Sequence, residues 1–231
     1  MDATKLIAAI IQARLTSTRL PRKVLKEFKG LSVIEIVVER LKQSKNLDEI
    51  IVAIPDNKEN DDLKQLLKAK NIKFFAGSEN DVLDRFYNCS KKYNLSTIVR
   101  ITGDCPFVDP TLVDDFIEKF KRLNIDYLSN TNPPTYPDGI DVEVFSKELL
   151  SVSNENALEI FDREHVTTFA KKEKNFKKIN IKSQKDHSDL RLTLDDRSDL
   201  RVIENVFDSF DDIFFSYDEI INLYDQNAEL F

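Results

Sequence analysis

Continuous apolar runs alternate with amphipathic segments through the first half of this chain, and this alternation constrains its fold more than any other feature. The run at residues 5–11 (KLIAAII) is expected to form a strand that is buried on both faces of a sheet. Further strands are expected at residues 49–54, 73–76 and 96–102. Helices are expected from Ser32 to Leu41 and at residues 61–70, 80–93 and 109–122. This order predicts a three-layer α/β/α fold around a mostly parallel sheet.

The pattern changes after residue 125. Short strands are expected at residues 127–130 and 140–145, on either side of a proline-rich loop, and at residues 177–182 and 189–194, which can form a hairpin. Helices are expected near residues 147–153, 163–172, 198–210 and 217–226. We find no repeat or linker, so we predict one domain over residues 1–231, with residues 125–190 as a substrate-side elaboration.

Helix-capping patterns mark several helix starts. Ser32 with Glu35 has the spacing of a capping box, in which each side chain bonds the backbone of the other residue. Ser216 with Glu219 has the same spacing. Residues 109–110 (Asp-Pro) are expected to be the N-cap and first residue of their helix, because proline is favoured there.

Composition narrows the classes of function. The net charge of −7 argues against broad binding to nucleic acid or to anionic membranes, and no apolar run is long enough to span a membrane. The N-terminal apolar stretch is short, lacks a basic region before it, and is interpreted as a strand and not as a signal peptide. The two cysteines, Cys89 and Cys105, have no metal-binding spacing. We therefore expect a reduced, cytoplasmic protein.

A basic loop follows the first strand. It holds four cations, Arg14, Arg19, Arg22 and Lys23, interleaved with hydroxyl side chains at residues 16–18. Ligands of open α/β sheets bind outside the carboxyl ends of the strands, and these donors suit a triphosphate. The alternative is a solvated basic loop. The sequence contains neither the P-loop pattern nor a GxGxxG pattern after the first strand.

Two carboxylates are candidate metal ligands. Asp104 follows the fourth strand on a turn preceded by glycine, where it can hold Mg²⁺ against phosphates; the alternative is a turn or capping residue. Asp195 ends the run at 189–194 and is the natural second ligand. Asp196 and Asp199 compete with it, although capping of the next helix is the favoured interpretation of Asp196.

Other charged side chains have a functional and a structural interpretation. Asp81 and Arg85 lie one helical turn apart and can form a simple ion pair. Arg100 lies inside an apolar strand, where it can reach a ligand or pair with a buried carboxylate. Asp141 and Glu143 are expected on one face of a strand, to bind acceptor hydroxyls or an amine, or to form the wet face of an edge strand.

The segment QARLTSTRLPRK (12–23) resembles the N-terminal signature of the CMP-sugar synthetases, a cytidylyltransferase family. It is similar to the 3-deoxy-manno-octulosonate cytidylyltransferases and more so to the spore-coat polysaccharide type, whose pattern is QAR-x-x-STRLP-x-K. The matching residues are Gln12, Ala13, Arg14, Ser17, Thr18, Arg19, Leu20, Pro21 and Lys23. Thr16 and Arg22 stand where the family often has glycine, which permits positive φ and a close backbone approach.

The resemblance implies a Rossmann-like, nucleotide-diphospho-sugar transferase-like fold and a CTP-dependent cytidylyltransferase. Such an enzyme uses Mg²⁺ to transfer CMP from CTP to a small acidic sugar-like acceptor for polysaccharide or glycoconjugate biosynthesis, and it is commonly a homodimer, for which residues 125–190 offer a surface. The implied catalytic residues are Arg14, Lys23 and Asp104. The implied nucleotide-binding residues are Gln12, Ala13, Arg14, Ser17, Arg19, Lys23, Gly77, Ser78, Asp81, Arg85, Arg100 and Asp104. The implied metal ligands are Asp104 and Asp195. The implied acceptor-binding residues are Asp138, Asp141, Glu143, Arg163 and His165.

Two other functions remain open at this level. A nucleotide-sugar-dependent glycosyltransferase on a similar sheet normally has a DxD sequence after the fourth strand, where this chain has GDC (103–105). A non-catalytic relative would bind a nucleotide without turnover, but the basic loop is retained together with Asp104. Pyrophosphate release separates the transferase from both.

Overall fold

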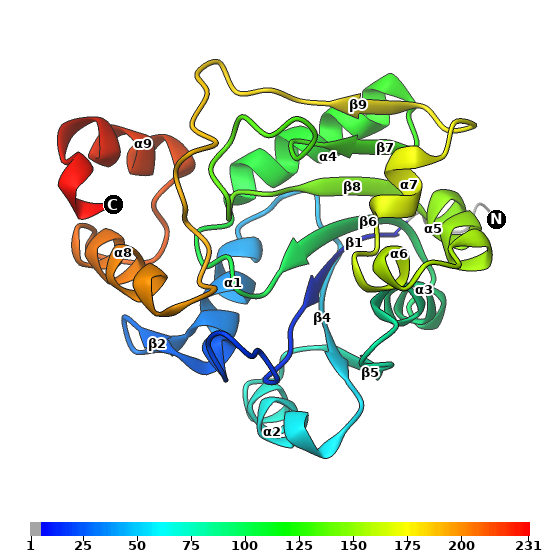
Figure 1. Cartoon of the computed structure of the whole chain (residues 1–231), viewed down its shortest axis with the longest axis horizontal. Coiled ribbons are helices and arrows are strands. Elements are labelled where there is room, and N and C mark those ends of the chain that lie inside the picture. Colours follow the sequence, from blue (N-terminus) through cyan, green and yellow to red (C-terminus); the bar gives the residue numbers. More distant parts are fainter. Residues whose placement is uncertain (1–5) are drawn as a thin grey trace.

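The structure is a computed structural model and describes residues 6–231 (Figure 1). Its centre is a seven-stranded sheet in the order β5-β4-β1-β6-β8-β7-β9. The strands are β1 (Leu6–Gln12), β4 (Glu49–Pro55), β5 (Phe74–Gly77), β6 (Leu95–Thr102), β7 (Tyr127–Ser129), β8 (Glu143–Ser146) and β9 (Lys178–Asn180). A separate two-stranded hairpin joins β2 (Glu27–Phe28) to β3 (Leu31–Ser32). Lys5, with which the first predicted strand begins, lies outside the described residues.

The sheet is mostly parallel, as the strand–helix alternation predicted. Strand β1 pairs in parallel with both β4 and β6, and β4 pairs in parallel with β5. Strand β8 runs antiparallel to its neighbours β6 and β7, and β9 pairs in parallel with β7. The chain leaves β1 toward β4 on one side and returns to β6 on the other. This reversal creates a crevice at the carboxyl end of β1, which is where open α/β sheets bind ligands.

The helices begin close to the positions that their capping patterns predicted. They are α1 (Val33–Leu41), α2 (Asp61–Ala69), α3 (Val82–Lys92), α4 (Pro110–Leu123), α5 (Lys147–Asn156), α6 (Ile160–Glu164), α7 (Thr168–Lys172), α8 (Arg197–Asp208) and α9 (Tyr217–Gln226). Capping boxes are present at Ser32 and Ser216, and Asp109 is the N-cap of α4 with Pro110 as its first residue. Short 3₁₀ helices span Lys23–Leu25, Lys58–Asn60 and Ala228–Leu230.

Both faces of the sheet are buried, which explains the continuous apolar run of β1. Ala9 and Ile11 face a core that includes side chains of α1, α2 and α4, whereas Ala8 and Ile10 face a core that includes α3, α5 and α7. Successive side chains of a strand point to opposite faces, so every residue of a doubly covered strand must be apolar. Figure 1 shows the helices on the two sides of the sheet.

A third core lies beside the sheet and carries the end of the chain. Phe107 packs against Phe207 of α8 and Phe215, with ring centroids 4.9 and 5.7 Å apart. Arg40 of α1 is fully buried and donates hydrogen bonds to the carbonyl oxygens of Val108 and Phe215, at 2.8 and 2.7 Å. These contacts fix the loop that follows β6 against the last quarter of the chain.

Several predictions for the second half of the chain are wrong. Residues 189–194 form no strand and no hairpin with 177–182; Arg191 makes only an isolated bridge with Asp138. The predicted helix at 163–172 is two short helices, α6 and α7. Strand β8 begins at Glu143 inside the sheet, so Asp141 precedes it and neither an edge strand nor a shared wet face exists. Local patterns mislead here because pairing across the sheet, and not periodicity, decides short strands.

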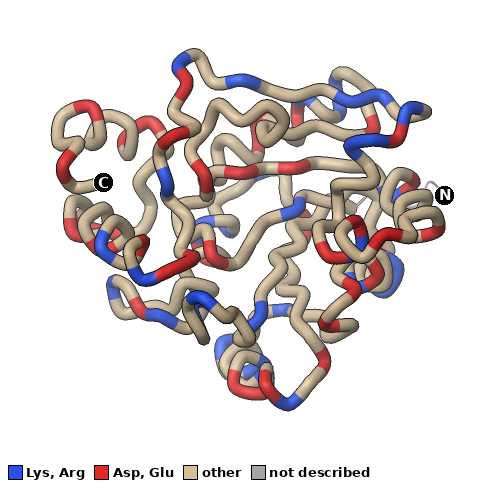
Figure 2. Tube along the Cα trace, viewed as in Figure 1, with Lys and Arg blue, Asp and Glu red and all other residues tan. Residues whose placement is uncertain are grey.

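Charges of both signs are interspersed along the trace (Figure 2). Among the described residues, no helix has the length and apolar content needed to cross a membrane.

Candidate active site

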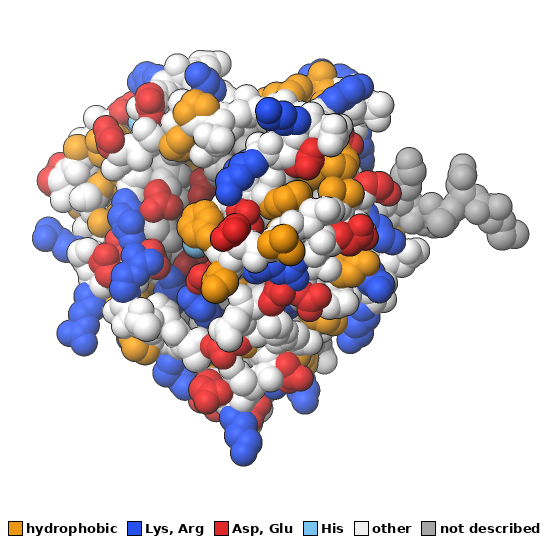
Figure 3. Space-filling model, turned by 45° about the vertical axis from the view of Figure 1, so that its right-hand side comes forward, with side chains coloured by type: hydrophobic (Ala, Val, Ile, Leu, Met, Phe, Trp, Pro, Cys, Tyr) orange, Lys and Arg blue, Asp and Glu red, His pale blue; other side chains and the backbone are white. Residues whose placement is uncertain are grey.

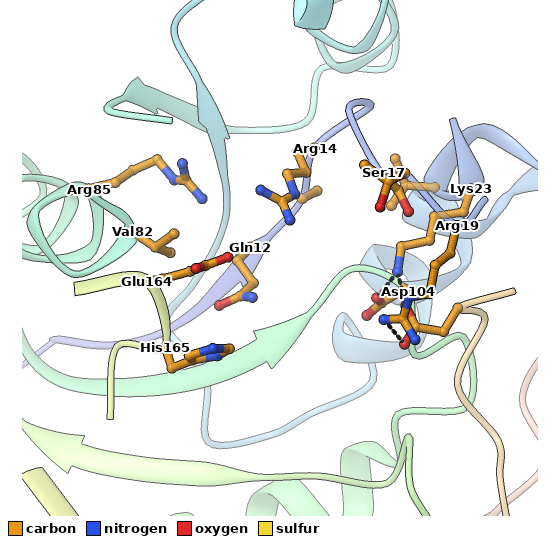
Figure 4. Close-up of a pocket in the computed structure, with 14 residues that line it drawn as sticks. Gln12, Arg14, Ser17, Arg19, Lys23, Val82, Arg85, Asp104, Glu164 and His165 are labelled. Atoms are coloured by element: carbon orange, nitrogen blue, oxygen red, sulfur yellow. Dashed lines mark hydrogen bonds and ion pairs between the residues drawn. The ribbon is translucent and has the colours of Figure 1, made fainter. Parts of the chain in front are cut away.

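A cavity of about 290 Å³ opens at the carboxyl ends of β1 and β6, beside the loop that follows β1 (Figure 4). It brings together most of the residues that the sequence selected. Predicted site residues that line it are Gln12, Ala13, Arg14, Ser17, Arg19, Lys23, Arg85, Asp104, His165 and Asp195. Segments from both halves of the chain therefore build one site, and their roles in binding remain predictions.

Backbone contacts hold the loop after β1 in place. Ala13 N–H donates to Ala53 O at 3.1 Å, and Leu15 N–H donates to the buried side chain of Asn60 at 2.8 Å. Arg22 N–H then donates to Leu15 O at 3.1 Å, which closes the loop. The loop is thus a fixed turn that aims the side chains of Arg14, Ser17, Thr18 and Arg19 at the cavity.

Arg22 departs from the expected basic cluster. Its φ is 60°, in the left-handed region that the family glycine at this position would adopt without strain. Its guanidinium donates to Asp62 of α2 at 2.8 Å and does not line the cavity. Of the four cations of the loop, Arg22 is therefore the one that points away from the cavity.

The Lys23 ammonium lies between two carboxylates. Lys23 Nζ is 2.7 Å from Asp195 Oδ1 and also contacts Asp104 Oδ2. Although burial favours the neutral amine, Asp104 and Asp195 outweigh it and raise the pKa of Lys23 above its ordinary value. Burial likewise opposes the ionised Asp195, but the hydrogen bond from Lys23 and the charges of Lys23 and Arg19 hold the pKa of Asp195 below its usual range.

Glycine at 103 permits the close approach of the Asp104 turn to β1. A Cβ at Gly103 would lie 3.0 Å from both Ala13 Cβ and Gln12 O, tighter than ordinary contact. Gly103 N–H donates to Gln12 O at 2.9 Å, which extends the β1–β6 pairing by one residue. Asp104 is consequently held beside the basic loop by the backbone of the sheet itself.

Asp195 reaches the site although it does not end a strand. Leu194 N–H donates to Asp104 O at 2.8 Å, which docks this segment on the turn that bears Asp104. The Asp199 carboxylate accepts from the N–H groups of Asp195 and Asp196, at 2.6 and 2.8 Å. Asp196 is the N-cap of α8, as its favoured interpretation predicted.

The chemistry of Asp104 and Asp195 suits a divalent cation that arrives with a nucleotide. Within residues 6–231 no cluster of three or more His, Cys, Asp or Glu side chains is close enough to form a complete protein cage for a metal. Mg²⁺ does not require one, because it is usually bound by one or two carboxylates together with substrate phosphates and water. The two carboxylates already converge on one positive charge, that of Lys23.

On the α3 side, the simple Asp81–Arg85 ion pair, the structural alternative for these two residues, does not form. Asp81 caps α3 and pairs instead with Arg163, whose Nη2 lies 2.6 Å from Asp81 Oδ2. Arg85 donates to Ser78 O, and burial together with the nearby charge of Arg14 lowers the pKa of Arg85 to about 10. Gly77 leaves room for Arg85, since a Cβ there would lie 3.1 Å from Arg85 Cγ.

The remaining predicted residues lie outside the cavity. Arg100 pairs with Glu143, whose side chain is 1% exposed, so the buried-pair interpretation of Arg100 holds and Glu143 presents no free face. Asp138 Oδ2 lies 3.4 Å from Arg191 Nη1. Residues outside the lining are Gly77, Ser78, Asp81, Arg100, Asp138, Asp141, Glu143 and Arg163.

Four lining residues were not among the predicted site residues: Thr18, Val24, Val82 and Glu164. Thr18 was nevertheless one of the loop hydroxyls that suited a triphosphate. Glu164 lies between Arg163 and His165. We therefore identified the right segment from the sequence, but selected Arg163, which lies outside the lining, and not Glu164. The ring of His165 packs on Phe161, with centroids 4.2 Å apart. Figure 4 shows His165 and Glu164 on one side of Gln12 and Arg14.

Comparisons with known proteins agree with this geometry. A family model described as cytidylyltransferase matches residues 8–230. The chain is 34% identical to the spore coat polysaccharide biosynthesis protein SpsF of Bacillus subtilis, over 87% of this chain and 86% of that protein. It is 39% identical to an uncharacterized protein of Methanocaldococcus jannaschii, over 89% and 84% of the two chains. The solved structure of a cytidylyltransferase from Leptospira borgpetersenii superposes with a TM-score of 0.94 at 30% identity, covering 98% of this chain and 96% of that one.

Proposed function

Because this chain belongs to the cytidylyltransferase family, we propose that it transfers CMP from CTP to a small, acidic, sugar-like acceptor and releases pyrophosphate. It is a CTP-dependent nucleotidyltransferase, and its relative SpsF is named for polysaccharide biosynthesis. We assign this chain to the same kind of pathway, in the cytoplasm. The whole chain acts as one domain in this proposal, with residues 125–190 on the acceptor side.

One observation carries the proposal: the cavity combines a cationic loop with paired carboxylates. Arg14, Arg19 and Lys23 line one cavity with Asp104 and Asp195. Cationic donors neutralise phosphate charge, and the carboxylates balance the cations when no phosphate is bound. A triphosphate that enters would compete with Asp195 for Arg19 and Lys23, which frees the carboxylates for a metal.

The reaction needs positioning and charge neutralisation more than a protein nucleophile. An acceptor oxygen forms a bond to the α-phosphorus in line with the bond that breaks, and pyrophosphate leaves with that bond's electron pair. The hydroxyl proton of the acceptor passes to solvent. Arg14 and Lys23 hold the phosphates and stabilise the negative charge that develops on the pyrophosphate.

Asp104 and Asp195 would hold the metal, which we propose to be Mg²⁺. Such an ion would neutralise phosphate charge and favour ionisation of the acceptor hydroxyl. Lys23 holds the two carboxylates close together by donating a hydrogen bond to each. An acidic acceptor is supported by the excess of cations on the α3 side, where Arg14 and Arg85 outnumber the one carboxylate, Glu164.

We also propose that the enzyme is a homodimer. Leu158, which precedes α6, and Ile160 and Phe161, which begin it, are 88%, 81% and 58% exposed. Figure 3 shows apolar side chains among charged ones on one face of the molecule. Burying such side chains against a second copy is favourable. Light scattering on the wild type and on Ile160→Ser tests this assembly: a wild-type monomer at micromolar concentration contradicts it.

The nucleotide specificity is tested by thermal shift with CTP, ATP, GTP and UTP, each with and without Mg²⁺. A ligand that binds only the folded state raises the melting temperature by mass action. We expect the largest shift for CTP with Mg²⁺, followed by pyrophosphate release when acidic sugars are added. A larger shift for another nucleotide would overturn the cytidine assignment.

A further inference from the structure

Polar side chains cross three adjacent strands of an otherwise apolar sheet. Gln12 ends β1, Arg100 lies in β6, and Glu143 begins β8. Arg100 and Glu143 are register partners across the antiparallel pair, and β1 lies on the other side of β6. Apolar neighbours on these strands, such as Ile10 and Phe145, belong to the core under α3 and α5. Burying an ion pair in such a core carries a desolvation penalty. This penalty is offset only if each charged group has well-placed partners, and those of Arg100 lie on the two neighbouring strands.

Arg100 divides its donors between the two neighbouring strands. Its Nη1 pairs with Glu143 Oε2, and its Nε donates to Gln12 Oε1 at 3.2 Å. A guanidinium has donors only, so the atom of Gln12 that faces Arg100 must be the amide oxygen. The Gln12 NH₂ group is therefore turned away from Arg100.

Glu143 prevents Arg100 from turning away from Gln12. The Glu143 carboxylate also accepts hydrogen bonds from Tyr127 and from Thr167 Oγ1, the latter at 3.0 Å, and pairs with Lys171 Nζ at 2.9 Å. Burial opposes its ionisation, but the charges of Arg100 and Lys171 lower the pKa of Glu143 to about 2. The anchor is thus ionised throughout the neutral range and held from three further side chains.

Gln12 is the member of this row that reaches the cavity. It lines the cavity between Arg14 and His165 (Figure 4). No hydrogen bond from its amide nitrogen to another side chain or backbone group is present among residues 6–231. An oriented donor at the wall of the cavity can form its hydrogen bond with a ligand that supplies an acceptor atom.

We propose that Arg100 is a positioning residue: by holding Gln12 Oε1 it fixes the Gln12 NH₂ group as a hydrogen-bond donor to an acceptor atom of bound CTP. CTP is the ligand to expect because Gln12 lines the same cavity as the phosphate-binding cations Arg14 and Lys23, and the inference rests on the proposed function in this respect. Arg100 itself lies outside the lining and acts through Gln12.

A double-mutant cycle on the full-length enzyme tests this coupling, with the CTP dissociation constant in Mg²⁺ as the readout. Gln12→Met removes the donor at similar volume and should weaken CTP binding roughly five- to tenfold, the size of one hydrogen bond. Arg100→Lys keeps a cation for Glu143 but has a single nitrogen that cannot serve both partners. It should weaken binding to a similar extent in the wild type and cause no further loss in Gln12→Met.

Tyr127→Phe is the matched control, because it removes a different hydrogen bond to Glu143 and leaves Gln12 untouched. It should lower the melting temperature without changing the affinity for CTP. If Arg100→Lys does not fold, Arg100 and Glu143 are both replaced by Met, which removes the two charges together. The CTP affinity of this variant is then compared with and without Gln12→Met.

The outcomes separate the inference from the proposed function. Losses that simply add in the double variant, or unchanged affinity in Gln12→Met, would overturn the inference while wild-type turnover still supports the enzyme. A wild type that does not bind CTP would remove the proposed function and the inference with it.

Discussion

Lys23 Nζ lies 2.7 Å from Asp195 Oδ1, although 172 residues separate the two in the sequence. The same ammonium contacts Asp104, so the basic loop, the turn after β6 and the segment before α8 meet at one charge. Each of the three segments is fixed by backbone hydrogen bonds, through Asn60, Gly103 and Asp199 respectively. The centre of the site is therefore held in place by the protein's own hydrogen bonds, which is the preorganisation that electrostatic catalysis requires.

Replacing Lys23 should remove phosphate binding and unpair two carboxylates. We expect Lys23→Ala to lower kcat/KM by about 100-fold or more while the protein remains folded, since charged donors to a developing oxyanion are worth roughly that much. Steady-state pyrophosphate release measures the loss. Arg22→Ala is the matched control: it deletes a cation of the same loop that points to Asp62 and should retain near wild-type turnover. Equal losses in both variants would count against a specific role for Lys23.

The metal assignment predicts different results for adjacent aspartates. Asp104→Asn and Asp195→Asn should each abolish Mg²⁺-dependent turnover, because an amide is a much weaker metal ligand than a carboxylate. Asp196→Asn should retain it, since Asn also caps helices and the side chain of Asp196 bonds Ser198 N–H at 2.9 Å. Activity titrated against Mg²⁺ concentration distinguishes them, and metal dependence that survives in Asp104→Asn would place the ion elsewhere.

The backbone at Arg22 predicts a stability difference between two small replacements. Because φ is 60°, Arg22→Gly should be more stable than Arg22→Ala by about 1 kcal/mol, the typical cost of a Cβ in the left-handed region. Both variants lose the same exposed ion pair with Asp62, so the comparison isolates the backbone. Urea unfolding provides the free energies, and equal stability of the two variants would contradict the strain.

Asp141 predicts a stability difference that depends on pH. Burial, and then the charges of Asp138 and Glu143, raise the pKa of Asp141 from 3.8 to about 6 in the fold. The folded state therefore favours the protonated form, and this contribution to stability is lost as pH rises through about 6.

Asp141→Asn cannot ionise and should be more stable than the wild type at pH 8, by on the order of 1–2 kcal/mol, with the difference shrinking toward pH 4. Urea unfolding of both proteins across this range measures it, and the subtraction cancels the other titrating groups. A constant difference across the range would rule out this ionisation. If Asp141 also contacts the acceptor, the more stable variant should have a higher acceptor KM.

Gly139 predicts a disruptive substitution outside the cavity. Its φ is 106°, and a Cβ there would lie 2.6 Å from the backbone carbon of Leu192. Gly139→Ala should therefore push back the segment that leads to Asp195 and lower the melting temperature by several degrees, whereas Gly30→Ala meets no atom within 4 Å and keeps only the cost of its positive φ. Thermal unfolding compares them, and a smaller effect at Gly139 would contradict the close packing.

The parallel half of the fold and the basic loop could be predicted from local sequence patterns. A strand that is buried on both faces is a continuous apolar run, which identified β1. Capping side chains have fixed spacings, which identified the starts of α1, α4 and α9. The run from Gln12 to Lys23 likewise identified the family, because its residue types are tied to one chemistry.

Which charged side chains face the cavity could not be predicted from these local patterns. Arg22 turns to α2, Asp81 pairs with Arg163, and Glu143 is buried under Arg100, although each looked like a site residue in its own segment. Asp195 reaches Lys23 without a strand to carry it. The physical reason is that an ion pair depends on distance in space, and the strand order that sets those distances is fixed by pairings between segments far apart in the chain.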